Sequence, residues 1–131
     1  MKLKNKDILK FVNGCTALRE KKLPVRLGYA IKKNLGSVSD AANAYNTERC
    51  ALISRYAEKD NNGHSLIEEG RYRIKDKENF EKDLNELLEI ETEVNLHQVT
   101  LEEIEKCEDP RYDALTVADL EALEVMTEWG R

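Results

Sequence analysis

The chain has 131 residues, of which 40% are hydrophobic and 36% are charged, and its formal net charge is −5. This composition is too apolar for a disordered chain and too charged for a membrane protein, and the length fits one helical domain over residues 1–131. The net charge is +8 over residues 1–33, zero over residues 34–75 and −13 over residues 76–131, so the two ends attract partners of opposite sign. No apolar run is long enough to span a bilayer and no apolar segment follows the first lysines, so we expect a cytoplasmic protein with no membrane contact.

The first segment predicts a helix over residues 6–20. Asn5 is a suitable N-cap, Asp7 suits the first turn, and apolar residues recur at helical spacing in Ile8, Val12, Cys15 and Leu18. Gly14 is expected to weaken this helix, because glycine has a low helix propensity. Residues 1–4 are expected to form either a short strand or an arm.

A long helix is predicted from Pro24 to about Lys59, and the rest of the chain is organised around it. Proline fits the first turn of a helix. After it, apolar side chains recur at spacings typical of one helical face, in Leu27, Ile31, Leu35, Val38, Ala41, Ala42, Tyr45, Leu52, Ile53 and Tyr56. Such a helix spans roughly 50 Å, so other segments, a second copy or a partner must cover it.

Gly36 leaves two interpretations of this helix open. Lys32, Lys33 and Gly36 resemble a helix end, and Ser37 with Asp40 resembles a capped restart. The apolar stripe nevertheless stays in phase across Gly36, which a loop would not require. We therefore favour a continuous or gently kinked helix over two helices that meet at this glycine.

The middle of the chain predicts a hairpin and a second amphipathic helix. Segments 65–68 and 71–74 flank a Glu-Gly turn and are expected to pair. Asp76 then caps a helix that ends near Glu91, with its apolar positions at Phe80, Leu84, Leu87 and Leu88. Because the spacing matches that of the long helix, an antiparallel pairing of the two helices buries both stripes.

The last third predicts an extended run and two short helices. Residues 92–99 alternate between apolar and polar and are expected to pair with 71–74 as a minimal sheet. Thr100 caps a helix to about Cys107, and Thr116 caps a last helix whose buried face is Leu120, Leu123, Met126 and Trp129. The predicted fold class is mainly α (α+β): an antiparallel long-helix hairpin with an N-terminal helix, a small two- or three-stranded β element and short C-terminal helices.

No group of residues predicts catalysis, a metal site or a cofactor. Cys15, Cys50 and Cys107 are isolated, which favours small buried thiols over a disulfide or a zinc site. Residues 60–71 fail the EF-hand pattern, and the acidic residues of 102–113 are better explained as a solvated face. Neither histidine lies in a nucleophile motif, so we expect a protein that is not an enzyme.

Two charged features have alternative explanations. Arg49 interrupts the apolar stripe, either as an interface or ligand contact or, as we favour, in an ion pair with Glu86 or Glu89. The basic residues of 1–33 either contact nucleic-acid phosphates or neutralise the acidic last third. The net acidity of the chain favours internal neutralisation.

The order of these parts resembles a family of small phage and prophage proteins of Gram-positive bacteria. The resemblance is carried by the opening Met-Lys-Leu-Lys-Asn-Lys-Asp, the Lys22-Leu23-Pro24 start of the long helix, segments 56–63 and 72–76, and the closing Leu115-Thr-Val-Ala-Asp-Leu120. The Gly36-Ser37 pair departs from the uninterrupted helix of that family. The resemblance implies a phage-type accessory role in a bacterial cytoplasm, and no activity or functional residue carries over from it.

We therefore expect a protein that acts by protein–protein interaction, either as an inhibitor of a host defence factor or as a component of virion or tail assembly. Its partner would be a host or phage protein, and the long helix can also pair with a second copy. The alternatives are an acidic nucleic-acid mimic, nucleic-acid binding by the basic N-terminal third, and an enzyme with an unrecognised site. The candidate partner-binding residues are Lys21, Lys22, Arg26, Tyr45, Arg49, Tyr56, Glu102, Glu105 and Trp129.

Overall fold

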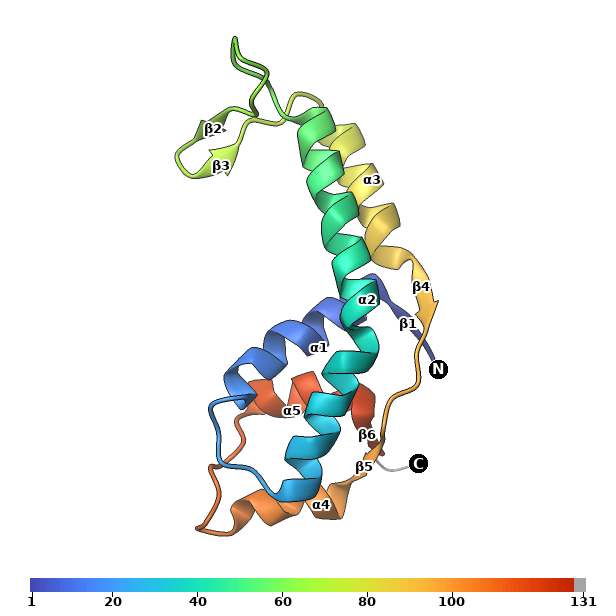
Figure 1. Ribbon diagram of the computed structural model, residues 1–131, viewed down its shortest axis with the longest axis vertical. Helices are drawn as coiled ribbons and strands as arrows, with labels where there is room; N and C mark the ends of the chain where they lie inside the picture. Colours follow the sequence, from blue (N-terminus) through green and yellow to red (C-terminus); the bar gives the residue numbers. More distant parts are fainter. Residues whose placement is uncertain (129–131) are drawn as a thin grey trace.

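The computed structural model describes residues 1–128, and its central element is a single 32-residue helix, α2 (Val25–Tyr56) (Figure 1). The helix continues without a break through Gly36, so the predicted continuous helix is confirmed and the two-helix alternative is wrong. The buried residues Asn34 and Val38 on either side of Gly36 keep the same face of α2 turned inward. Ala57 is extended and ends the helix.

The first half of α2 is surrounded by the two ends of the chain. α1 (Asn5–Leu18) crosses it, and α4 (Leu101–Glu105) and α5 (Val117–Leu123) lie close by, each followed by one 3-10 turn, Lys106–Glu108 and Glu124–Met126 (Figure 1). The largest fully buried side chains of this main core are Ile8, Phe11, Leu18, Leu27, Val38, Val99, Leu123 and Met126. The core therefore joins segments from both ends of the sequence to α2.

The second half of α2 is covered on one side by α3 (Lys77–Glu89), which runs antiparallel to it (Figure 1). A separate, smaller core fills this pair, with Tyr45, Leu52 and Leu87 buried and Phe80, Leu84 and Leu88 packed against them. The Tyr56 hydroxyl donates to Asp83 Oδ2 at 2.7 Å, and its ring meets Phe80 edge-on with centroids 5.8 Å apart. The predicted long-helix hairpin is thus confirmed.

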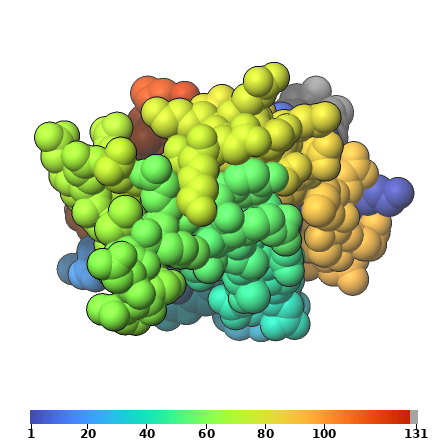
Figure 2. Space-filling model, turned by 90° about the horizontal axis from the view of Figure 1, so that it is seen from above, coloured from blue at the N-terminus to red at the C-terminus, as the bar shows by residue number. Residues whose placement is uncertain are grey.

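The strands pair differently from the prediction. β1 (Lys2–Lys4) pairs antiparallel with β4 (Glu91–Glu93), β5 (Val99–Thr100) pairs parallel with β6 (Thr127–Glu128), and β2 (Ile67–Glu68) pairs only with β3 (Arg71–Tyr72) among the described strands. The expected pairing of 92–99 with 71–74 is therefore wrong. The β2–β3 hairpin closes locally through Glu69 and Gly70, whose φ angles are 53° and 78°. Helix α3 then runs away from this hairpin, so the residues after α3 lie beside β1 (Figure 1). Figure 2 shows this hairpin arm to one side of the ends of α2 and α3.

Two buried asparagines hold distant segments together. The prediction of Asn5 as an N-cap is wrong, because Asn5 is the first residue of α1 itself. Its side chain turns inward and donates to the Leu87 carbonyl at 2.8 Å. Asn34 is fully buried on α2, where its side chain accepts from the His97 N–H at 2.6 Å and donates to the His97 carbonyl at 2.9 Å. These bonds tie the start of α1 to the end of α3, and the middle of α2 to the segment that precedes β5.

Candidate functional site

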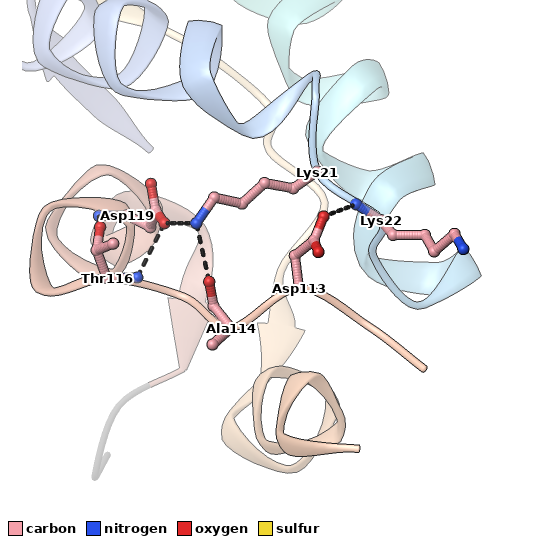
Figure 3. Close-up of polar contacts among 6 residues, drawn as sticks. All are labelled: Lys21, Lys22, Asp113, Ala114, Thr116 and Asp119. Atoms are coloured by element: carbon pink, nitrogen blue, oxygen red, sulfur yellow. Dashed lines mark hydrogen bonds and ion pairs between the residues drawn. The ribbon is translucent and has the colours of Figure 1, made fainter. Parts of the chain in front are cut away.

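Two of the predicted partner contacts connect the α1–α2 loop to the C-terminal segment, Lys21 through its ammonium and Lys22 through its backbone (Figure 3). The Lys21 ammonium donates to Asp119 Oδ2 and to the Ala114 carbonyl, both at 2.8 Å. The Lys22 N–H donates to Asp113 Oδ2 at 2.7 Å, and the Asp113 N–H donates back to the Lys22 carbonyl at 2.9 Å. We call these contacts the Lys21 latch.

Asp119 lies at the centre of the Lys21 latch, with its side chain only 6% exposed. Burial alone would raise the pKa of this carboxyl group. The Lys21 ammonium and the Thr116 N–H, which donates at 2.9 Å, outweigh burial, so the pKa of Asp119 lies below its usual value. Asp119 is therefore ionised and paired with Lys21 at neutral pH.

Other cations of the basic N-terminal third also pair with the acidic last third. Lys4 and Lys6 both contact Glu89, at 2.6 and 2.9 Å, and Arg26 lies 3.7 Å from Glu103. Hydrogen bonds from Lys4 and then Lys6 lower the pKa of Glu89 below its usual value. These contacts agree with internal neutralisation of the two oppositely charged ends, although Arg26 itself remains largely exposed.

The other predicted contact residues within residues 1–128 lie on α2 and α4 and differ in their exposure. Tyr45 is buried in the α2–α3 core and Tyr56 is half-buried against α3, so neither presents a full side chain to a partner. Arg49 is exposed and forms no ion pair within residues 1–128, so its predicted pairing is wrong. One of its expected partners, Glu89, is held by Lys4 and Lys6. The α4 residues Glu102 and Glu105 are exposed, and Trp129 lies outside the described residues.

A surface that the sequence reasoning missed runs along α2 beside the end of α1. It consists of two adjoining hollows of about 330 and 490 Å³ that share Arg19, Lys32 and Leu35. We call it the α2 groove. Its α2 side is formed by Val25, Gly28, Tyr29, Lys32, Leu35, Gly36 and Ser39, and its other side by Leu18, Arg19 and Leu23.

Two glycines leave the backbone of α2 open in this groove. A Cβ atom added at Gly28 or at Gly36 would meet no atom within 4 Å. Glycine in a helix is less favourable than alanine by about 1 kcal/mol, so both residues weaken α2 without any packing contact that requires them. Gly14 is different, because a Cβ atom there would lie 2.2 Å from the Ala122 Cβ. Gly14 is needed within the fold, whereas Gly28 and Gly36 only shape the groove.

The groove combines an apolar lining with positive charge. Its charged lining residues are Arg19, Lys21 and Lys32, and none is acidic. Lys21 is held by Asp119, whereas Arg19 and Lys32 form no ion pair in the part of the chain described. Val25 and Tyr29 extend the apolar lining onto the surface, where they are 85% and 61% exposed. The signal available in the sequence was the eight-residue spacing of Gly28 and Gly36 outside the buried stripe.

The three cysteines do not share one environment, which corrects the expectation of buried thiols. Cys15 and Cys107 are buried, whereas Cys50 is exposed on α2. Burial raises the pKa of the Cys15 thiol to about 12 and also raises the pKa of Cys107. Cys50 is therefore the one cysteine of the three whose residue is exposed to solvent.

We expect a disulfide reagent such as DTNB to modify one thiol rapidly in the folded protein at mildly alkaline pH. The reactive species is the thiolate, which burial suppresses at Cys15 and Cys107. All three thiols should react in denaturant. Cys50→Ser should abolish the rapid phase, and a rapid phase that survives this substitution would contradict the buried placement of the other two.

Comparison with protein-family models, curated proteins and solved structures finds no match for this chain. Within residues 1–128, no cluster of histidine, cysteine or acidic residues is suited to hold a metal ion. No helix in that range has both the length and the hydrophobicity needed to cross a bilayer. The α2 groove is therefore the feature of residues 1–128 that best indicates a function.

Proposed function

We propose that this protein is a non-enzymatic binding protein that docks a helix of another protein in the α2 groove. The supporting observation is the pair of glycines, Gly28 and Gly36, which open the α2 backbone on a surface with an apolar lining. From Val25 to Ser39 the groove spans about 21 Å, enough for about four turns of a partner helix. An amphipathic helix in an apolar groove is a common mode of protein recognition.

In biological terms, we propose a phage-type accessory role in which the bound protein is either a host defence factor or a component of the phage particle. The resemblance to phage and prophage proteins supports this proposal. Nucleic-acid binding and acidic mimicry have weaker support, because several of the charges they would use pair with one another. Among these are the pairs of Lys4 and Lys6 with Glu89 and of Lys21 with Asp119.

Site-specific photocrosslinking in cells that naturally encode the protein tests this proposal. A benzophenone amino acid at Tyr29 in the groove should capture a protein, whereas the same group at Tyr72 on the hairpin arm should not. Both tyrosines are exposed, so they form a matched pair. Gly36→Leu should remove the Tyr29 product, because its Cβ atom meets no neighbour and the rest of the side chain occupies space in the groove. Equal capture at both sites, or capture that Gly36→Leu leaves unchanged, would contradict the proposal.

A further inference from the structure

We infer that the occupant of the α2 groove is an acidic amphipathic helix of a partner protein, with small side chains against Gly28 and Gly36 and carboxylates near Arg19 and Lys32. This inference rests on the proposed function and specifies the chemistry of the partner. Three features of the groove support it: the row of residues that contains both glycines, the apolar lining, and the sign of the free charges.

Gly28, Lys32 and Gly36 are spaced by four residues, so they form one of the side-chain rows by which helices pack against each other. The glycines on either side of Lys32 leave the α2 backbone without a side chain at two points of this row, about 12 Å apart. A second helix can then approach α2 closely if it also has small side chains at the contact, while the Lys32 stem lies alongside. Neither glycine contacts another element of this chain, so the close approach is available to a partner.

The apolar lining favours a helix over a nucleic acid. Leu23 and Leu35 are half-buried in the groove, and Val25 and Tyr29 stand beside them largely exposed. Phosphate backbones are recognised mainly by cations and polar groups and would leave these side chains without an apolar partner. An amphipathic helix would cover them with its own apolar face.

The charged residues of the groove indicate the sign of the charge on the partner helix. Arg19 and Lys32 lie on the two sides of the groove, and no acidic residue lines it. Opposite charges at the rim of an interface speed association and exclude partners of the wrong sign. The partner helix should therefore have carboxylates on both sides of its apolar face.

A second copy of this chain does not offer such a helix. α3 is its acidic amphipathic helix, but Leu87 and the neighbouring leucines of α3 are already packed against α2. The side chain of Leu123 on the short helix α5 is fully buried in the main core. Docking either helix in the groove of a second copy would require the first copy to unfold in part.

Selection from a displayed library of helical peptides tests the inference. Peptides are selected on the wild-type protein and depleted on Gly36→Leu, so that only groove-dependent binders remain. We expect these peptides to be acidic, to have small residues within the apolar face, and to bind more weakly as salt is raised. Lys32→Glu should weaken their binding by about five- to tenfold, whereas Lys75→Glu, between β3 and α3, should change it by less than about twofold.

The other outcomes separate the inference from the proposed function. Groove-dependent peptides that are neutral or basic, or that tolerate Lys32→Glu, would overturn the acidic partner and leave the groove as a docking site. A dimer or a nucleic-acid complex that Gly36→Leu abolishes would also overturn the inference, because the occupant would then be a second copy or a nucleic acid. If no groove-dependent peptide is recovered and Tyr29 gives no specific crosslink, the proposed function fails as well.

Discussion

Gly14→Ala is expected to lower the free energy of unfolding by about 1–3 kcal/mol, although alanine alone would favour the helix by about 1 kcal/mol. The reason is the crossing of α1 and α5, where an added Cβ atom would lie 2.2 Å from the Ala122 Cβ. Carbon atoms prefer separations of about 3.5–4 Å, so the two helices would have to move apart. Urea unfolding followed by circular dichroism measures the change.

The matched control for this substitution is Gly36→Ala, which should raise the free energy of unfolding by about 0.5–1 kcal/mol. Both glycines lie within helices, and only Gly14 meets a neighbour. Ala122→Gly combined with Gly14→Ala should recover stability beyond the sum of the single changes, because it removes the clashing methyl group. If Gly14→Ala instead stabilises the protein as Gly36→Ala does, the close α1–α5 crossing is wrong.

The contrast between these glycines shows what sequence reasoning supplies and where it ends. Gly14 was expected to weaken its helix, because propensity is a local property that the sequence displays directly. The close contact between Gly14 and Ala122 joins residues 108 positions apart in the chain, and no local pattern predicts it. The continuity of α2 through Gly36 was predictable, since the apolar stripe that keeps its phase is itself a local pattern.

Strand pairing and the candidate site were less predictable for the same reason. β4 pairs with β1 because α3 is long enough to place the residues that follow it beside the N-terminal strand. Charge alone marks Lys21 as a candidate contact, but whether its cation faces a partner or an acid of its own chain depends on tertiary packing. The α2 groove was missed because its residues are inconspicuous: two glycines that contact nothing.

Lys21→Met is expected to lower the free energy of unfolding by about 2–3 kcal/mol at neutral pH. The substitution keeps most of the apolar stem and removes the ammonium that donates to Asp119 and to the Ala114 carbonyl. Asp119 would then be a carboxylate that is only 6% exposed, with the Thr116 N–H as its main remaining donor. Asp119→Asn should cost less, about 1 kcal/mol, because the partly exposed Lys21 can turn towards water whereas a buried carboxylate cannot.

The pH dependence distinguishes loss of the ion pair from loss of packing. In the wild-type protein the pKa of Asp119 lies below its usual value, so its contribution to stability is present above about pH 4 and is lost as the pH falls through the folded-state pKa. Without Lys21, burial becomes the dominant influence and should raise this pKa above its usual value. The ionised carboxylate then destabilises the variant at neutral pH, and protonation relieves that cost as the pH falls.

The difference in stability between Lys21→Met and wild type should therefore be largest near neutral pH. It should begin to shrink above about pH 4, as Asp119 of the variant becomes protonated, and should go on shrinking until the pH falls below the folded-state pKa of the wild-type protein. Urea unfolding at a series of pH values measures it. Lys21→Met combined with Asp119→Asn should be more stable than Lys21→Met alone at neutral pH, because the uncompensated charge is gone. A deficit that stays constant from neutral to acidic pH would mean that Lys21 acts through the packing of its stem and not through its charge.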